Sequence, residues 1–523
     1  MYGTSMRENR EIPCSPTRLI TGWAVQGTQG GTPEMHERGK SDRSVVPVNP
    51  PNKAVEAAAE VGEERGRAKG NTDSKTRPGR SAGSDASSAL GRVREVARRD
   101  KDARFTALLH HVSLGRLRAA YWAIRPQAAP GVDGVTWADY GRDLEASLQD
   151  LHVRVQAGRY RAKPSRRVYI PKADGRQRPL GIASLEDKIV QRAVVEVLGA
   201  VCEVDFRGFS YGFRPGRGPH HALDALAVGI SRKKVNWVLD ADLRNFFGQL
   251  DHAWLRKFLE HRIADKRVLR LINKWLAAGV IEDGQWTAGE EGSPQGASVS
   301  PLLANVYLHY VYDLWVDWWR RTQARGEVIT VRFADDFIVG FEHEEDARRF
   351  LDELRERLAK FGLELHPDKT RLIEFGRHAA RNRGSRGLGK PETFDFLGFT
   401  HICAKSRSGW FWLKRITIAK RMRAKLRGVN DQLKRRMHQP IPVQGQWLRS
   451  VVQGHLAYYA VPGNADAVAA FRDQVTRHWL KALRRRSQRT RLTWARMGPI
   501  AKRWLPRARA MHPFPEVRFA ART

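Results

Sequence analysis

Cysteine is rare in this chain: Cys14, Cys202 and Cys403 are the three cysteines among 523 residues. They lie far apart and form no Cys-x-x-Cys pair, which argues against a disulfide framework and a zinc site. The chain also lacks an apolar run long enough to span a bilayer, and its first residues contain no apolar signal core. We therefore expect no membrane partner and a reducing, cytoplasmic location.

Acidic residues are scarce relative to basic ones. The chain has 56 aspartates and glutamates against 92 lysines and arginines, a formal net charge of +36. Residues 401–523 alone carry 28 basic and 4 acidic side chains. This excess predicts a polyanionic partner, either a nucleic acid or an acidic membrane surface. Aromatic residues scattered among the basic ones favour a nucleic acid, which needs phosphate contacts and stacking platforms, although these rings could also fill a helical core.

Composition and periodicity predict five parts. The first is rich in Gly, Ser, Pro and charge, which is typical of a disordered tail, and order is expected from about Ala89. Helices and a basic β-hairpin follow, then a mixture of strands and helices, then helical periodicity after Gly409, and finally a basic tail. The predicted bounds are 1–88, 89–235, 236–400, 401–485 and 486–523.

Two adjacent aspartates, Asp335 and Asp336, interrupt the apolar stretch TVRFADDFIVGFE. The flanking residues predict two short strands joined at the acidic pair, and Asp is also a common turn residue. Upstream, the strand in NWVLDADLRNFFGQLDH ends with Asp240 and Asp242 on one face. Carboxylates from a strand end and a hairpin that meet at one point would suit Mg²⁺ and two-metal nucleotidyl transfer.

Seven blocks of the sequence occur in the order found in bacterial group II intron reverse transcriptase/maturases, which the chain resembles over residues 90–523. The blocks are RVYIPKADGRQRPLGIASLEDKIVQ, FSYGFRPGRGPHHAL, LDADLRNFFGQLDH, GSPQGASVSPLLANVYL, RFADDF, LHPDKT and FLGF. WLRSVVQGHLAYYAVPGN and HPFPEVRF resemble the maturase domain and its basic extension. The resemblance implies an α+β right-hand polymerase fold, with fingers, a palm built on an antiparallel sheet, an α-helical thumb/maturase domain and a DNA-binding tail.

The resemblance implies roles for individual carboxylates. Asp242, Asp335 and Asp336 match the catalytic triad that binds two Mg²⁺ ions, with Mn²⁺ as an alternative ion, and Asp336 matches the less direct ligand. Lys369 matches a lysine proposed to protonate the pyrophosphate leaving group. Asp240 is an additional carboxylate, which could belong to the site or be a solvated residue at the strand end.

The resemblance also implies contacts to the deoxynucleoside triphosphate. Phe247 matches a ring that excludes the ribose 2′-hydroxyl, although the sequence leaves open whether Phe246 or Phe247 faces the core. Lys172 and Arg178 could hold the triphosphate or contact the RNA backbone. The predicted nucleotide-binding residues are Lys172, Arg178, Phe247, Gln295 and Gly296. The predicted nucleic-acid-binding residues of the basic tail are Arg484, Arg485, Arg486 and Arg489.

The expected function is RNA-directed DNA synthesis by a protein that also binds its group II intron RNA to assist splicing and retrohoming. The expected partners are that RNA, a DNA target or primer and dNTPs, and the protein would join the nucleoid when it acts on DNA. Two features depart from the family pattern. Phe333 stands where the family often has Tyr. Cys403 is the one cysteine after residue 400, so we expect no cysteine-ligated HNH endonuclease domain. The alternatives are a splicing-only maturase with an inactive polymerase and a retron or diversity-generating reverse transcriptase.

Overall fold

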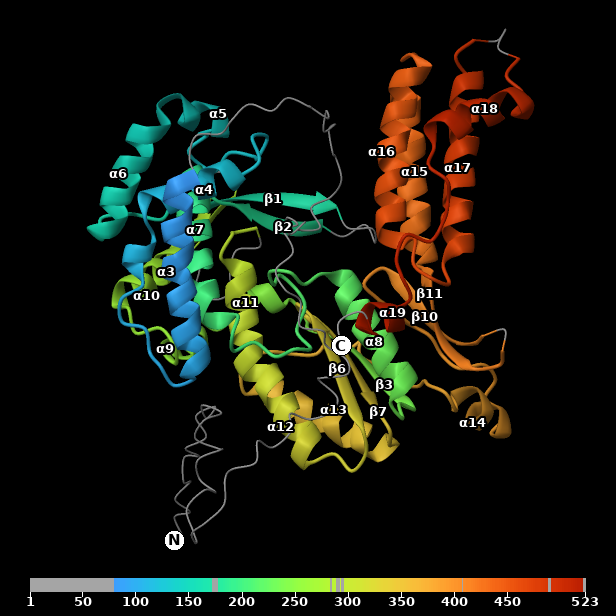
Figure 1. Ribbon diagram of the computed structural model, residues 1–523, viewed down its shortest axis with the longest axis horizontal. Helices are drawn as coiled ribbons and strands as arrows, with labels where there is room; N and C mark the ends of the chain where they lie inside the picture. The colour runs from blue at the N-terminus through green and yellow to red at the C-terminus, as the bar shows by residue number, and fades with distance from the viewer. Residues whose placement is uncertain are drawn as a thin grey trace.

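The computed structural model describes residues 80–171, 177–282, 285–287, 292, 296–406, 408–487 and 491–520. Helices and strands alternate through these residues, which confirms the expected mixture of α and β structure (Figure 1). Helix α3 (Arg80–Arg99) begins at Arg80, within the segment 1–88 that the sequence predicts to be a tail. The rest of that expected tail, 1–79, lies outside the described residues.

A helical layer packs around α7 (Leu185–Cys202), which is buried along most of its length. Ser184 caps this helix, because its hydroxyl accepts a hydrogen bond from the backbone N–H of Asp187. Helices α3 and α4 (Leu114–Ala123) contact α7 directly. The other helices of this layer are η1 (Leu109–His111), α5 (Trp137–Tyr140), η2 (Gly141–Asp143), α6 (Leu144–Gln156), α9 (His252–Glu260) and α10 (Lys266–Ala277).

A four-stranded sheet in the order β2-β1-β4-β5 extends from this layer. Strands β1 (Ser165–Pro171) and β2 (Gln177–Ile182) form the expected antiparallel hairpin. Strands β4 (Val280–Glu282) and β5 (Gln285–Thr287) complete the sheet, with β4 parallel to β1.

The central sheet, β6-β7-β3-β8, is antiparallel throughout. Its strands are β3 (Trp237–Asp242), β6 (Val328–Phe333), β7 (Asp336–Phe341) and β8 (Arg371–Glu374). Because side chains alternate along a strand, Val238 and Ile338 pack with α8 (Pro219–Arg232), whereas Leu239 and Val339 join the larger core on the other face. That second core includes side chains of α11 (Ser300–Leu308), the π-helix η4 (His309–Asp313), the helix α12 (Leu314–Thr322) and α13 (Glu344–Ala359), besides those of η3 (Phe246–Gly248).

A three-stranded sheet, β11-β10-β9, connects the central sheet to the last helices. Its strands are β9 (Phe394–Phe396), β10 (Phe399–Lys405) and β11 (Phe411–Thr417), and α14 (Ala379–Ser385) precedes them. The helices after residue 401 therefore begin later than the expected boundary, because residues 401–405 and 411–417 are strands. The helices are α15 (Ala419–Arg435), α16 (Ile441–Tyr459), α17 (Ala465–Arg484), α18 (Trp494–Trp504) and α19 (Pro515–Ala520).

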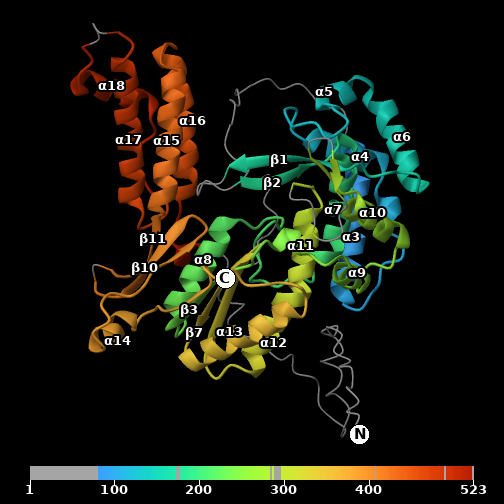
Figure 2. The same cartoon turned by 180° about the vertical axis from the view of Figure 1, so that it is seen from behind.

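Helices α15 to α18 form a C-terminal bundle with its own core, which includes Leu433, Val452, Trp479 and Met497. The bundle stands beside the β1–β2 hairpin, on the same side of the central sheet (Figures 1 and 2). Helix α19 returns to pack against α8. Among the described helices, none combines the length and apolar character needed to cross a membrane.

Candidate active site

The acidic pair lies at a tight turn between β6 and β7, as the sequence predicts. Phe333 pairs with Asp336, so Ala334 and Asp335 form a two-residue loop. Ala334 adopts a positive φ of 57°, which a two-residue hairpin of this kind requires. Gly212 packs against this turn so closely that a Cβ there would lie 2.3 Å from the Ala334 nitrogen. The turn is thus held by its surroundings as well as by its own strands.

The central sheet brings the three predicted catalytic aspartates together at one end. Asp242, the last residue of β3, lies directly opposite Asp336, the first residue of β7. Burial raises the pKa of Asp336 well above its usual value, and the Asp335 charge and a side-chain hydrogen bond with Asp242 add to this. Burial also raises the pKa of Asp335, with a contribution from the Asp242 charge. The like charges are therefore close enough to oppose one another's ionisation.

Two basic side chains predicted from the sequence lie near these carboxylates. The Lys369 ammonium forms an ion pair and a hydrogen bond with Oδ2 of Asp242. The charges of Arg178 and Lys369 both lower the pKa of Asp335, against the larger effect of burial. The backbone N–H of His366 donates to the Asp242 carbonyl at 2.8 Å, which ties the LHPDKT segment to the end of β3. Lys172 lies outside the described residues.

Asp240 belongs to the same acidic group but has a partner of its own. Its carboxylate lies 3.5 Å from the Arg371 guanidinium of the neighbouring strand β8. Burial nevertheless raises the pKa of Asp240 to about 7, with smaller contributions from the Asp395 and Asp242 charges. The Asp240 charge also raises the pKa of Asp336. Asp240 is therefore a partly buried, ion-paired residue beside the site rather than a solvated strand end.

The structure shows which of Phe246 and Phe247 faces the core, a question that the sequence left open. Asn245 adopts a left-handed conformation with φ of 44°, and the short helix η3 follows. Phe246 is 2% exposed and lies in the core, whereas Phe247 is only partly buried. The predicted contact residue is thus the ring with an accessible surface.

The loop before α11 approaches the β1–β2 hairpin. Gly296 has φ of 112°, and a Cβ there would lie 2.7 Å from the Gly181 carbonyl oxygen. Only glycine therefore fits without a shift of the backbone. Two residues later, the backbone N–H of Ser298 donates to the Gln191 side chain at 2.9 Å. Gln295 lies outside the described residues.

The donor set suits a hard divalent cation. Its oxygens come from carboxylates whose mutual repulsion a cation would relieve, and these are the ligands that Mg²⁺ prefers. Over the described ranges, however, no group of three or more His, Cys, Asp and Glu side chains is already gathered as a metal site. Lys369 instead engages Asp242. A cation bound at this carboxylate would have to compete with the Lys369 ammonium.

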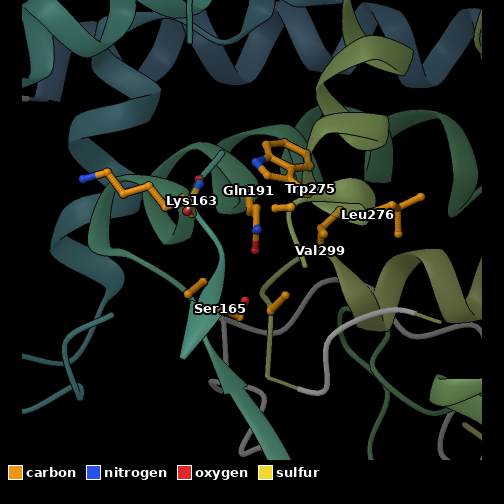
Figure 3. A pocket seen from close by; sticks show the side chains of 10 residues that line it. Lys163, Ser165, Gln191, Trp275, Leu276 and Val299 are labelled. Atoms are coloured by element: carbon orange, nitrogen blue, oxygen red, sulfur yellow. Dashed lines mark hydrogen bonds between the residues drawn. The ribbon is translucent and has the colours of Figure 1, made fainter. Parts of the chain in front are cut away.

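A small cavity lies beside strand β1, and none of the three predicted catalytic aspartates lines it (Figure 3). Ser165, Gln191, Trp275 and Val299 line it, together with the buried carboxyl group of Asp187. Its volume of about 10 Å³ is enough for roughly one water molecule and far too small for a nucleotide. The candidate active site is therefore the group of Asp242, Asp335 and Asp336 rather than this cavity.

The predicted basic cluster at the end of α17 is only partly available to a ligand. Arg484 Nε donates to the Leu492 carbonyl at 2.7 Å. Arg486 donates to the Gln439 carbonyl, and burial lowers its pKa. Arg485 is exposed. Arg489 lies outside the described residues.

Sequence reasoning missed a buried ionic group behind the acidic turn. Arg332 and Asp313 are both 0% exposed and lie 2.6 Å apart, although they are 19 positions apart in the sequence. The one available signal was an arginine inside an otherwise apolar strand, since such a residue is seldom buried without a partner. Nothing in the sequence identifies Asp313 as that partner.

Comparisons with known proteins agree with this geometry. Residues 170–401 match the family described as reverse transcriptase (RNA-dependent DNA polymerase). Protein YkfC of Escherichia coli K12 is 36% identical over 314 residues, which cover 54% of this chain and 77% of that protein. Group II intron-encoded protein LtrA of Lactococcus lactis subsp. cremoris is 36% identical over 166 residues, covering 32% of this chain and 27% of LtrA.

An uncharacterized 91 kDa protein in the cob intron of Schizosaccharomyces pombe is 41% identical over 146 residues, covering 28% of this chain and 18% of that protein. The matches to intron-encoded proteins thus span a minor part of those relatives' length. The reverse transcriptase match includes the whole central sheet and all three aspartates. This chain therefore belongs to the group II intron-encoded reverse transcriptase/maturase family.

Proposed function

We propose that this protein is an RNA-directed DNA polymerase that extends a primer 3′-hydroxyl with dNTPs on an intron RNA template. The observation that carries the proposal is the meeting of Asp242, Asp335 and Asp336 at one end of the central sheet. Burial and the neighbouring aspartate charges raise the pKa values of Asp335 and Asp336 there, and a bound cation would relieve the repulsion between these carboxylates. Two Mg²⁺ ions, when bound, would stabilise the attacking and leaving oxygens of the phosphoryl transfer.

The surrounding residues supply positioning, charge and selectivity. Arg178, exposed on β2 and electrostatically coupled to Asp335, would hold triphosphate oxygens. Lys369 donates to Asp242 and carries a proton that it could pass to the pyrophosphate leaving group. The exposed side of the Phe247 ring would oppose a ribose 2′-hydroxyl. Lys172, Gln295 and Gly296 are proposed to complete the nucleotide contacts.

The elements correspond to the parts of a right hand in this proposal. The β1–β2 hairpin and the helices around α7 form the fingers, the central sheet forms the palm, and α15 to α17 form the thumb. The basic C-terminal bundle and the residues after it would hold structured intron RNA and the DNA target through phosphate contacts. This binding would assist splicing and retrohoming without a catalytic residue of the protein, in the cytoplasm and at the nucleoid.

Primer extension on an RNA template tests the proposal. The full chain would be supplied with Mg²⁺ and either dNTPs or rNTPs at moderate salt, beside an Asp335→Asn/Asp336→Asn control. We expect DNA synthesis from dNTPs that the control lacks. The absence of extension, together with tight binding of intron RNA and faster splicing, would instead identify a splicing-only maturase.

A second comparison separates this function from that of a retron or diversity-generating reverse transcriptase. The protein would be offered its own intron RNA and an unrelated structured RNA of equal length. We expect tighter binding of the intron RNA and faster splicing, because the bundle contributes a large basic surface. Equal binding of both RNAs with no effect on splicing would favour the other classes.

A further inference from the structure

The side chain of Arg332 is fully buried directly behind the catalytic turn. Its Nε and one terminal nitrogen donate to the two carboxylate oxygens of Asp313 at 2.7 and 2.6 Å. Its other terminal nitrogen donates to Oδ1 of Asn305 at 3.2 Å and to the Ala334 carbonyl at 3.0 Å. One guanidinium thus connects two helices to the peptide group immediately before Asp335. This planar fork is a geometry that a lysine cannot reproduce.

The partners of Arg332 are themselves fixed in place. Asn305, in α11, is 1% exposed, and its side-chain amide donates to the Gly212 carbonyl at 2.8 Å. Gly212 is the residue that packs against Ala334. The backbone of Arg332 is held too, because it exchanges hydrogen bonds of 2.9 Å with Phe209 and Tyr211. Hydrogen bonds and the close packing of Gly212 therefore hold the turn in place.

A local irregularity presents Asp313 to this network. The residues His309–Asp313 form a π-helix between α11 and α12. Such a segment adds a residue to a helix, changes the direction of the side chains after it, and is often found at functional sites. Asp313 is the last residue of this segment, and its carboxylate is 0% exposed. The π-helix thus ends at a buried charge that contacts Arg332.

We propose that Arg332, held by Asp313 and Asn305, is a positioning residue that sets the location of the Asp335 carboxylate for metal binding. The proposal rests on the function proposed for the three aspartates. It assigns the buried ion pair a task beyond stability, since a buried pair is by itself weak evidence of stabilisation. The Arg332 guanidinium holds the Ala334 carbonyl by a hydrogen bond, and this sets the direction of the backbone at Asp335.

The test compares Arg332→Lys with a matched variant of another buried pair. Arg415 lies 3.1 Å from Asp224, with side chains 3% and 4% exposed, in a different sheet. Both lysine variants keep the positive charge and lose the planar set of guanidinium hydrogen-bond donors. For each variant we would measure primer extension, the Mg²⁺ concentration that gives half the maximal rate, and the unfolding temperature. We would also measure Mn²⁺ binding to the enzyme without substrate, detected by electron paramagnetic resonance.

We expect Arg332→Lys to lower kcat roughly 100-fold, the scale of a misplacement of about 1 Å, with little change in KM for dNTP. The Mg²⁺ requirement should rise and Mn²⁺ should bind more weakly. Arg415→Lys should lower the unfolding temperature without either metal effect. An Arg332→Lys enzyme that is merely less stable, with unchanged kcat and Mn²⁺ affinity, would overturn the proposal. The Mn²⁺ measurement separates this outcome from a general failure of polymerase activity.

A second inference comes from a different surface, at the outer edge of the molecule. The segment between β8 and β9 is basic and carries α14, and Figures 1 and 2 both place α14 beside the outer end of the β10–β11 hairpin. Arg377 and Arg386 fasten this segment, by a hydrogen bond of 2.9 Å to the Ser231 carbonyl and by an ion pair with Glu374. We name the exposed residues here the edge surface: Arg381, Lys390, Lys405 and Trp410.

The edge surface combines cations with an unusually accessible aromatic ring. Trp410 is 75% exposed, more than any other large apolar side chain among the described residues. Its backbone is nevertheless ordered, since Ser406 exchanges hydrogen bonds of 2.8 and 3.1 Å with it. An exposed indole on the hairpin that also carries the exposed Lys405, near the basic segment of α14, matches the chemistry of an unpaired RNA segment, which offers bases for stacking and phosphates for ion pairing.

The edge surface lies away from the candidate active site. Glu374, at the end of β8, pairs with Trp237 at the start of β3, whereas Asp242 ends β3. The segment that carries α14 therefore leaves the sheet about 17 Å along the strand from the aspartates. We infer that the edge surface binds unpaired nucleotides of structured RNA while the active site holds primer and template. This inference rests on the proposed RNA binding.

The test measures binding of a fluorescent 12-nucleotide oligo(U) to the full chain saturated with primer–template. The triple variant Arg381→Gln/Lys390→Gln/Trp410→Ser should bind it about tenfold more weakly, since one stacked base contributes at that scale. The control Arg348→Gln/Arg355→Gln/Trp318→Ser removes two exposed cations and a 43%-exposed tryptophan elsewhere. Unchanged binding, or an equal loss in the control, would overturn the inference. Unaltered primer extension by the triple variant would separate this site from the polymerase.

Discussion

The central sheet and the C-terminal bundle use charge in opposite ways. Around the sheet, charges are buried and paired, as in the fully buried contact between Arg332 and Asp313. In the bundle, the cations line solvent-exposed helix faces, and the pair Lys434–Asp431 lies at the surface with more than half of each side chain exposed. Residues 401–523, which include the bundle, also contain few acidic residues.

This difference separates two tasks. Buried charges in a region of low dielectric are strongly coupled, so they can fix the location of a reacting carboxylate to a fraction of an ångström. Exposed charges interact weakly with one another but together attract a polyanion over a Debye length. Changes near the sheet should therefore alter catalysis without altering RNA binding, and changes in the bundle should do the reverse.

The largest expected effect comes from the aspartates. Asp335→Asn removes a charge that is proposed to bind metal ions while retaining the shape of the side chain. It should lower kcat by roughly 100- to 1,000-fold, equivalent to several kcal/mol of lost charge stabilisation. RNA affinity should stay within about twofold, because the phosphate contacts that dominate it lie elsewhere. Primer extension and filter binding on the same preparation check both. A large loss of RNA affinity would contradict the proposed separation of tasks.

Much of the central sheet could be predicted from the sequence. The strand, acidic pair and strand over residues 330–341 are local, and so is the helix that follows Ser184, because alternation and capping act between neighbours. The three aspartates could be predicted to form one site because the sequence blocks shared with the family identify each of them as part of the same catalytic set. The hairpin in RRVYIPKADGRQRPLGI is local for the same reason.

The remaining features depend on contacts between distant segments. The choice between Phe246 and Phe247 follows from the left-handed Asn245, whose conformation the sequence does not specify. The Arg332–Asp313 pair depends on a π-helix at residues 309–313, and no local sequence pattern predicts one. The strands that precede α15 belong to a sheet whose pairing is nonlocal, so helical periodicity could not set their boundary.

Phe246 and Phe247 allow a test of two different roles within the sheet region, one in stability and one in nucleotide selection. Phe247→Val should raise the use of rNTPs relative to dNTPs about 10- to 100-fold, because it removes the ring that is proposed to oppose the 2′-hydroxyl. Phe246→Ala should instead cost about 3–5 kcal/mol of folding stability, since that ring is buried. Competition between labelled dNTP and rNTP, together with denaturant unfolding, distinguishes the two. Unchanged sugar selectivity in Phe247→Val would remove the ring from the nucleotide site.

A buried histidine should make the bundle sensitive to acid. His455 stacks on Phe471 with centroids 3.6 Å apart, and burial lowers its pKa to about 4, with help from the Lys425 charge. The unfolded chain binds this proton near pH 6.5, so stability should fall as the pH drops from about 6.5 to 4, by up to about 1.4 kcal/mol per unit. His455→Phe should flatten this dependence in urea titrations at several pH values. The exposed His438→Gln serves as control, and an equal slope in all three proteins would exclude His455 as the cause.

The smallest expected effect tests the bundle's charges one at a time. Arg485→Gln removes an exposed cation at the end of α17 and should weaken RNA binding only a few-fold. It should also reduce the slope of log K against log salt by about 0.7 if the arginine contacts one phosphate of a single strand. Arg348→Gln, on the acidic helix α13, should leave both quantities unchanged. Because a lost phosphate contact changes the salt slope and a structural defect does not, the slope is the decisive measurement. An unaltered slope in Arg485→Gln would place the RNA on another face of the bundle.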